Sequence, residues 1–222
     1  MHIEPGLIAQ FKVMLANASA LGMMAYYAKD LIKQPADMVR TLVAALFFSL
    51  FMQSFHVPVG PSELHFVGAM VMYFTLGFLP TLLGFALGLL LQGLFFEPMD
   101  LPHLAVNALT LIVPLIAVHY TLGRKLRHKL SNTANDNKLN WQTILKLDAM
   151  YYSGVTAMVG FWLLIANVTT PFATWAAFAT SYLTIIAVEP FITYGAIRLL
   201  KRYEHTRLVN VCFAVKPLSL AN

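Results

Sequence analysis

Histidine and carboxylate side chains are the residues of this sequence best suited to chemistry. Four of the seven histidines, together with four carboxylates, occur near the ends of apolar segments; they are His2, His56, His65, His103, Glu4, Glu63, Glu97 and Asp100. Imidazole and carboxylate ligands in combination suit a divalent transition metal. The other three, His119, His128 and His205, lie close to basic residues and are interpreted as ordinary interfacial side chains.

The histidine at position 2 has a distinctive chelating geometry. The free α-amine of Met1 and the amide and ring nitrogens of His2 can close consecutive chelate rings on one metal ion. A fourth nitrogen would complete a square plane, which Ni(II) and Cu(II) favour and which is open to Co(II). Because residues 1–10 contain no Lys or Arg, they lack the charged region of a signal peptide, and we expect the mature chain to begin at Met1. A histidine at position 2 is most often incidental. A metal site at this position therefore becomes more credible only if another residue of the chain can supply a further ligand.

His65 is the candidate partner for His2. It follows a segment broken by Pro58, Gly60 and Pro61. Irregular backbone at membrane depth is tolerated where it lines a cavity, which favours a binding role. An interfacial residue at a helix start explains His65 equally well. His56 and His103 are weaker candidates, because loop histidines are common.

The composition is that of a membrane protein. Of the 222 residues, 59% are hydrophobic and 11% are charged, whereas a soluble domain carries about 25% charged residues. A core of this size cannot bury so much apolar surface, so lipid must surround part of the chain. The net charge of +5 reflects basic residues near helix ends and not a nucleic-acid surface. The single cysteine, Cys212, excludes an intrachain disulfide and a multi-cysteine metal site.

Hydropathy predicts an all-α, polytopic membrane helical bundle that forms a single transmembrane domain over residues 1–222. A crossing helix needs about 20 apolar residues, and about seven crossings are predicted, over residues 7–32, 38–55, 63–76, 77–96, 103–122, 145–168 and 171–201. The third is short enough to be re-entrant or strongly tilted. Residues 124–142 form a polar connector between the fifth and sixth crossings.

The distribution of basic residues predicts the orientation of the bundle. Cytoplasmic loops of membrane proteins are enriched in Lys and Arg. With the N-terminus outside and the C-terminus cytoplasmic, every basic residue except Lys12 falls at the cytoplasmic side. His2, His56, His65 and His103 then lie at the outer face.

Five segments, in order along the chain, resemble the CbiM/NikM family. They are Met1–Gly6, similar to the family's Met-His-Ile-Pro-Asp-Gly start; Val57–His65, similar to its Pro-Gly-Gly-Thr-Ser-Gly-His loop; and Leu91–Phe96, Ala105–Leu109 and Ala187–Thr193. Members of this family are the substrate-specific membrane components of energy-coupling-factor transporters for cobalt and nickel. Each motif is weakly specific, and their ordered set carries the resemblance.

The resemblance implies a metal site made of Met1, His2 and His65. It also places Gln92 and Asn107 near that site as groups that order it, although ordinary interhelical hydrogen bonding would explain both equally well.

The sequence departs from the family pattern at two carboxylates. Glu4 stands where the family has proline, and Glu63 stands two residues before His65. Either one could lie near the metal and add an oxygen ligand. The choice between cobalt and nickel therefore stays open.

The resemblance also implies partners. The chain contains no Gly-x-x-x-x-Gly-Lys-Ser/Thr loop, so it is not expected to be an enzyme. ATP hydrolysis would belong to cytoplasmic ATPase subunits, joined through a transmembrane coupling protein in a bacterial plasma (inner) membrane. Small residues at Ala16 and Ala20 could form the surface for the coupling protein, or could pack within the bundle.

Two other classes of function are compatible with the composition. A membrane-embedded metal- or haem-dependent enzyme would need histidines on facing helices inside the bundle, whereas those of the outer group lie near helix ends. The Cys-x-x-Cys-His signature of attached haem is also missing. In a non-metal channel or scaffold, the charged residues would serve topology alone.

Overall fold

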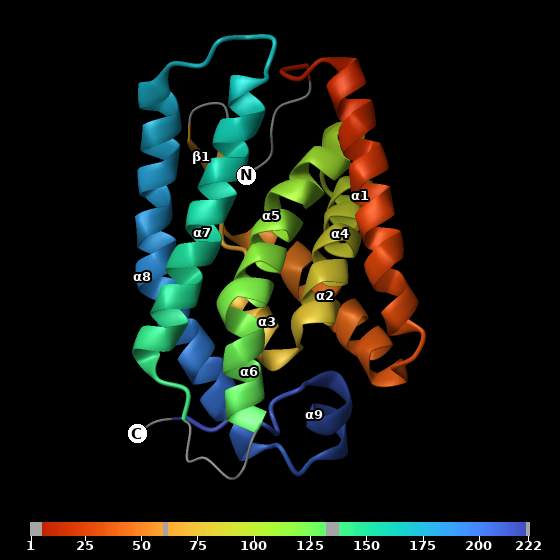
Figure 1. The fold of residues 1–222 in the computed structure, drawn as a ribbon, viewed down its shortest axis with the longest axis vertical. Coiled ribbons are helices and arrows are strands. Elements are labelled where there is room, and N and C mark those ends of the chain that lie inside the picture. The colour runs from red at the N-terminus through yellow and green to blue at the C-terminus, as the bar shows by residue number, and fades with distance from the viewer. Residues whose placement is uncertain (1–5, 60–61, 132–137, 221–222) are drawn as a thin grey trace.

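The computed structural model describes residues 6–59, 62–131 and 138–220, and these ranges are mostly helical. The long helices run roughly parallel or antiparallel in one bundle (Figure 1). Their bounds are α1 Gln10–Leu31, α2 Pro35–Ser54, α4 Phe78–Phe95, α5 Leu104–Val118, α7 Trp141–Leu164 and α8 Phe172–Arg202. The short elements are β1 His56–Val59, β2 Ser62–His65, α3 Ala69–Thr75, the 3-10 helix η1 Pro98–His103, the π-helical turn η2 His119–Gly123, α6 Arg124–Ser131 and α9 Arg207–Cys212.

Four helical segments among the described residues are long and apolar enough to cross a membrane, judged by length and composition. They are Pro35–Ser54, Phe78–Phe95, Pro98–Leu130 and Phe172–Arg202. Large apolar side chains such as Leu21, Leu46 and Phe191 stay exposed on the outside of the bundle. Exposed apolar faces of this extent fit a lipid environment. Helices α1 and α7 are also 22 and 24 residues long, but the number of membrane crossings stays a prediction.

The predicted third crossing, residues 63–76, is not a continuous helix. Strand β2 occupies its start and pairs antiparallel with β1. Gly68, just before α3, has a φ of 64°, a left-handed conformation that separates the extended backbone from the helix. Helix α3 has seven residues and extends about 10 Å, against a hydrocarbon core of about 30 Å. The predicted break near Pro58 therefore coincides with a β-hairpin whose first strand is largely exposed, and the short helix α3 that follows it is buried inside the bundle.

Helices α2 and α4 approach each other unusually closely through small residues. A Cβ atom added at Gly84 would lie 2.4 Å from the Cβ of Ala44, and one added at Gly88 would lie 2.9 Å from the carbonyl oxygen of Ala45. Only glycine fits at both positions. Small residues spaced four apart are a common means of close helix packing in membranes.

The small residues of α1 also face inward. Ala16 and Ala20 are buried, and α1 contacts α4 and α5. These alanines therefore pack within the bundle and do not form an exposed surface for a coupling protein.

The C-terminal segment closes one end of the bundle. Arg40 of α2 donates hydrogen bonds from Nη2 to the carbonyl oxygens of Asn210 and Phe213, at 3.3 and 3.2 Å. The Ala214 amide donates to the carbonyl oxygen of Thr75, at 2.6 Å, and so satisfies the last residue of α3. Figure 1 shows α9 at the lower end of the bundle, beside the turn between α1 and α2.

Candidate metal centre

His65 lies at the opposite end of the bundle from α9, in strand β2. Its side chain is 1% exposed, and Nδ1 is 3.2 Å from the carbonyl oxygen of Met52 in α2. A carbonyl oxygen only accepts hydrogen bonds, so the contact requires a proton on Nδ1. The Nε2 atom is then left as the ring nitrogen that can bind a metal or a further proton.

Glu63 faces that nitrogen. Its Oε2 atom lies 2.9 Å from His65 Nε2, because residues two apart on a strand project from the same face. A nitrogen lone pair and a carboxylate oxygen repel each other unless a cation neutralises the contact. Either a second proton on the imidazole or a metal ion can do so. Ligands held at about 2.0–2.1 Å at right angles lie about 2.9 Å apart, so this spacing fits two neighbouring ligands of one metal.

His56 lies across the hairpin from His65. The two residues are paired in register, and their ring centroids are 6.0 Å apart. The side chain of His56 is exposed, and its Nδ1 is 3.3 Å from the carbonyl oxygen of Gln53. From the sequence, His56 was a weaker metal-ligand candidate, because loop histidines are common. The sequence signal that could have predicted this pairing is the dipeptide Gly60-Pro61, which is typical of turns.

Further polar residues are buried where α4 ends and α5 begins. Gln92, His103 and Asn107 are 1%, 5% and 2% exposed. Within the described ranges, neither side-chain polar atom of Gln92 and neither ring nitrogen of His103 has a hydrogen-bond partner. Leaving such groups buried and unsatisfied costs stability, so native structures rarely contain them without a purpose. Gln92 and His103 thus have hydrogen-bonding capacity available for a ligand or another polar group.

Met1, His2 and Glu4 lie outside the described residues. The chain beyond them is anchored at the hairpin end of the bundle, because the Leu7 carbonyl oxygen accepts a hydrogen bond from the Asn167 amide at 2.8 Å. Within the described ranges, no group of three or more His, Cys, Asp or Glu side chains could hold a metal ion. Among the described residues, Glu63 and His65 could therefore supply two ligands but not a complete metal shell.

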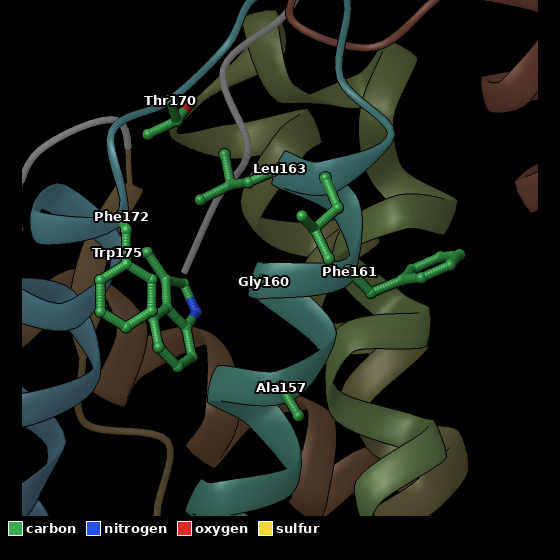
Figure 2. A pocket seen from close by; sticks show the side chains of 8 residues that line it. Ala157, Gly160, Phe161, Leu163, Thr170, Phe172 and Trp175 are labelled. Atoms are coloured by element: carbon green, nitrogen blue, oxygen red, sulfur yellow. The ribbon is translucent and has the colours of Figure 1, made fainter.

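An apolar pocket lies near the same end, between α7 and α8. Phe172 and Trp175 of α8, with Leu163 and Gly160 of α7, line a cavity of about 440 Å³. Figure 2 shows these residues around the pocket. The Trp175 Nε1 atom donates to the Thr156 carbonyl oxygen at 3.0 Å. This lining contains no imidazole or carboxylate, so it is unsuited to a metal ion.

His119 is held by structural contacts near the other end. Its Nδ1 lies 2.9 Å from the hydroxyl of Tyr73, and its ring stacks on Phe78 with centroids 3.7 Å apart. His56, His65 and His103 lie on the hairpin and on η1. His56, His65 and His103 therefore do not face His119 across the middle of the bundle, as two axial haem ligands would.

A helical bundle with lipid-compatible outer faces and a buried histidine beside a half-buried carboxylate fits the class of membrane proteins that handle metal ions. The chain is a member of the CbiM family, described as the cobalt uptake substrate-specific transmembrane region, whose family model matches residues 2–207. No curated protein sequence matches the chain.

Two solved structures share the fold. A crystal structure of a transition metal transporter has a TM-score of 0.70 and 20% sequence identity, and the match covers 94% of this chain and 96% of that one. A crystal structure of a truncated transition metal transporter has a TM-score of 0.66 and 20% identity, with 93% of this chain and all of that chain covered. At this level of identity the similarity establishes the fold.

Proposed function

We propose that this chain captures a divalent cobalt or nickel ion at the outer face of a bacterial plasma membrane, as the substrate-specific component of an ATP-driven uptake system. The observation that carries the proposal is His65, buried at one end of the bundle with Nε2 turned toward the Glu63 carboxylate. This arrangement lies in a chain that belongs to a cobalt uptake family.

The proposed ligands are the Met1 amine, the amide and ring nitrogens of His2, and His65 Nε2. The anchor at Leu7 limits their reach, because six extended residues span at most about 20 Å. A nitrogen-rich ligand set favours Ni(II) and Co(II) over Mg²⁺ and Ca²⁺, which prefer oxygen. Glu63, Glu4, Gln92 and Asn107 would surround these ligands and tune the choice of metal.

Partners supply the energy in this proposal. An ion cannot be concentrated across a membrane without an energy source, and the chain carries no ATP-binding loop. A transmembrane coupling protein and cytoplasmic ATPase subunits would provide it. The basic end of the bundle, which includes α6 and α9, would face those subunits, in keeping with the orientation predicted from the Lys and Arg distribution.

The test compares binding of Co²⁺ and Ni²⁺ by the purified protein, by His65→Ala, and by a protein extended by a few residues before Met1. Calorimetry should show binding by the unaltered protein and a loss of about 100-fold or more in affinity for both altered forms. The control is His205→Ala, which removes an exposed histidine outside the proposed site. Undiminished binding by the extended protein would rule out the amine as a ligand.

A second measurement tests the transport mechanism. Cells that produce this chain with the coupling and ATPase subunits of its uptake system should accumulate radioactive cobalt or nickel. Inactivating the ATPase subunit should abolish accumulation and leave ion binding by the purified chain intact. Accumulation that persists without ATP hydrolysis would contradict the proposed energy source.

A further inference from the structure

The interior of the bundle contains a pair of acidic side chains that take no part in the proposed metal site at Met1, His2 and His65, called here the outer site. Among the described residues, Asp148 of α7 and Glu189 of α8 are the carboxylates that the protein encloses completely, each 0% exposed. They are close enough to interact electrostatically. Taking a charged group out of water is costly unless an opposite charge accompanies it.

Hydrogen bonds fix Glu189 in place. Its Oε1 accepts from the Met70 amide at 2.7 Å, and its Oε2 accepts from the hydroxyl of Tyr152. Each carboxylate oxygen has two lone pairs, so both oxygens keep capacity for another partner. Glu189 is thus a rigid group held by α3 and α7.

Asp148 is different, because neither of its oxygens has a hydrogen-bond partner within the described ranges. No Lys, Arg or His side chain of these ranges forms an ion pair with Asp148 or Glu189. A structural role for Asp148 would require partners, since a buried polar group without them destabilises the fold. The carboxyl group is therefore available for a ligand.

Buried hydroxyl groups accompany the two carboxylates. Tyr151 and Thr193 are each 0% exposed, and their hydroxyl oxygens also have no hydrogen-bond partner among the described residues. Tyr151 interacts electrostatically with Glu189. Thr193 lies one turn beyond Glu189 on α8, and Asp148 lies one turn before Tyr152 on the antiparallel α7. Asp148 and Thr193 therefore lie at one level, about 6 Å from Glu189 toward the α9 end.

A line of tyrosines connects this cluster with the outer site. The hydroxyl of Tyr182 approaches the backbone of His65, and the Tyr182 ring stacks on that of Tyr152 at 5.1 Å. Tyr152 in turn donates to Glu189. Tyr182 and Glu189 are seven residues apart on α8, which places the cluster about 10 Å deeper than His65.

We propose that Asp148 and Glu189, with the hydroxyls of Tyr151 and Thr193, form an interior oxygen-ligand site in which a divalent cation rests on its way from the outer site to the opposite end of the bundle. The inference rests on the proposed transport function. Two carboxylates balance the charge of a divalent ion, which removes the cost of burying them unpaired.

The change from nitrogen ligands at the outer site to oxygen ligands at the interior site favours selection first and release afterwards. Nitrogen ligands bind cobalt and nickel more tightly and selectively than carboxylate and hydroxyl oxygens do. Movement through a membrane protein requires sites that are favourable enough to enter and weak enough to leave. An oxygen site behind a nitrogen site meets both requirements, because selection is complete before the ion reaches the weaker site.

The test uses Asp148→Asn in the full-length chain. The change removes a charge without breaking any hydrogen bond among the described residues, so the variant should be at least as heat-stable as the unaltered protein. Equilibrium binding of Co²⁺ should show two ions for the unaltered protein, the second weaker, and only the tighter ion for the variant. Uptake by the assembled transporter should fall on the order of tenfold, the effect expected when a metal site loses a carboxylate.

Two controls isolate the effect. Asp30→Asn removes an exposed carboxylate, and Thr110→Val removes a buried hydroxyl that accepts a hydrogen bond from Trp162; both should keep two bound ions and most of the uptake. A single Co²⁺ bound by the unaltered protein, or normal uptake by Asp148→Asn, would overturn the interior site and leave the outer site standing. If the unaltered protein bound no ion, the proposed function itself would fail.

Discussion

The contact between Glu63 and His65 brings a negatively charged carboxylate against an imidazole ring that is neutral in its unprotonated form. The spacing of 2.9 Å between His65 Nε2 and Glu63 Oε2 suits both a proton-bridged pair and two neighbouring metal ligands. Without a metal ion, a proton can occupy the contact, and under the proposed function a metal ion that binds His65 would displace that proton. Glu63 would then hold the ring in position before the ion arrives.

At the residue scale, we expect Glu63→Gln to weaken metal binding by about tenfold and to change the ratio of cobalt to nickel affinity. The amide keeps the size of the side chain but loses the negative charge beside His65. Competition calorimetry with the two ions measures both effects. A control is Glu204→Gln, which alters a carboxylate paired with Lys201 and should leave metal binding unchanged. Equal affinities for Glu63→Gln and the unaltered protein would show that the carboxylate takes no part.

The sequence singled out His65 and Glu63, because a break in an apolar run marks irregular backbone at a membrane face. The structure brings the two side chains together, and their role in binding metal stays a prediction. The pairing of His56 with His65 was missed, because it depends on a strand register that apolar periodicity does not reveal. The roles of Met1, His2 and Glu4 stay predictions, since these residues lie outside the described ranges.

At the element scale, the close approach of α2 and α4 gives a direct test of packing. We expect Gly84→Val to lower the free energy of unfolding by about 2 kcal/mol or more, because its Cβ would lie 2.4 Å from that of Ala44. Gly22→Ala is the matched control, since no atom lies within 4 Å of the Cβ it would add. That substitution should be neutral or slightly stabilising in a helix. Thermal or denaturant unfolding in detergent distinguishes the two.

The positions of the long helices could largely be predicted from the sequence, whereas the structure of the predicted third crossing could not. Long apolar runs bounded by Gly, Pro and charged residues predicted the places of α1, α2, α4, α5, α7 and α8. The segment of residues 63–76 is equally apolar in its second half, so hydropathy could not tell a crossing helix from a hairpin followed by a short buried helix. The left-handed Gly68 decides between them, and a glycine's φ is set by tertiary context.

At the scale of the whole molecule, the C-terminal segment is joined to the bundle through Arg40. We expect Arg40→Ala to lower the free energy of unfolding by about 2 kcal/mol. The substitution removes charged hydrogen bonds to the carbonyl oxygens of Asn210 and Phe213 and a partly buried ion pair with Asp37. Lys33→Ala is the control, since its pair with Asp30 is exposed and should contribute less than about 1 kcal/mol. Similar unfolding midpoints for both variants would show that the segment is loosely held.

The orientation of the molecule can be tested with single thiols. In a Cys212→Ala background, we expect Val168→Cys to react with a membrane-impermeant thiol reagent in intact cells. Lys33→Cys should react only after the membrane is opened. Both positions are exposed, and they lie at opposite ends of the bundle. The reverse pattern would place the hairpin at the cytoplasmic side and contradict capture from outside.

The hairpin of β1 and β2 has a consequence for how this protein can change through evolution. Surface loops usually accept insertions and deletions readily. Here His56 pairs with His65 in a fixed register, and a shift of one position would turn every side chain of β2 to the other face. His65 would then leave the bundle interior, and the half-buried Glu63 would turn to the other face with it. Substitutions within the hairpin that keep its length therefore preserve the strand register. Insertion or deletion of one residue in the hairpin would change that register and is expected to be rare.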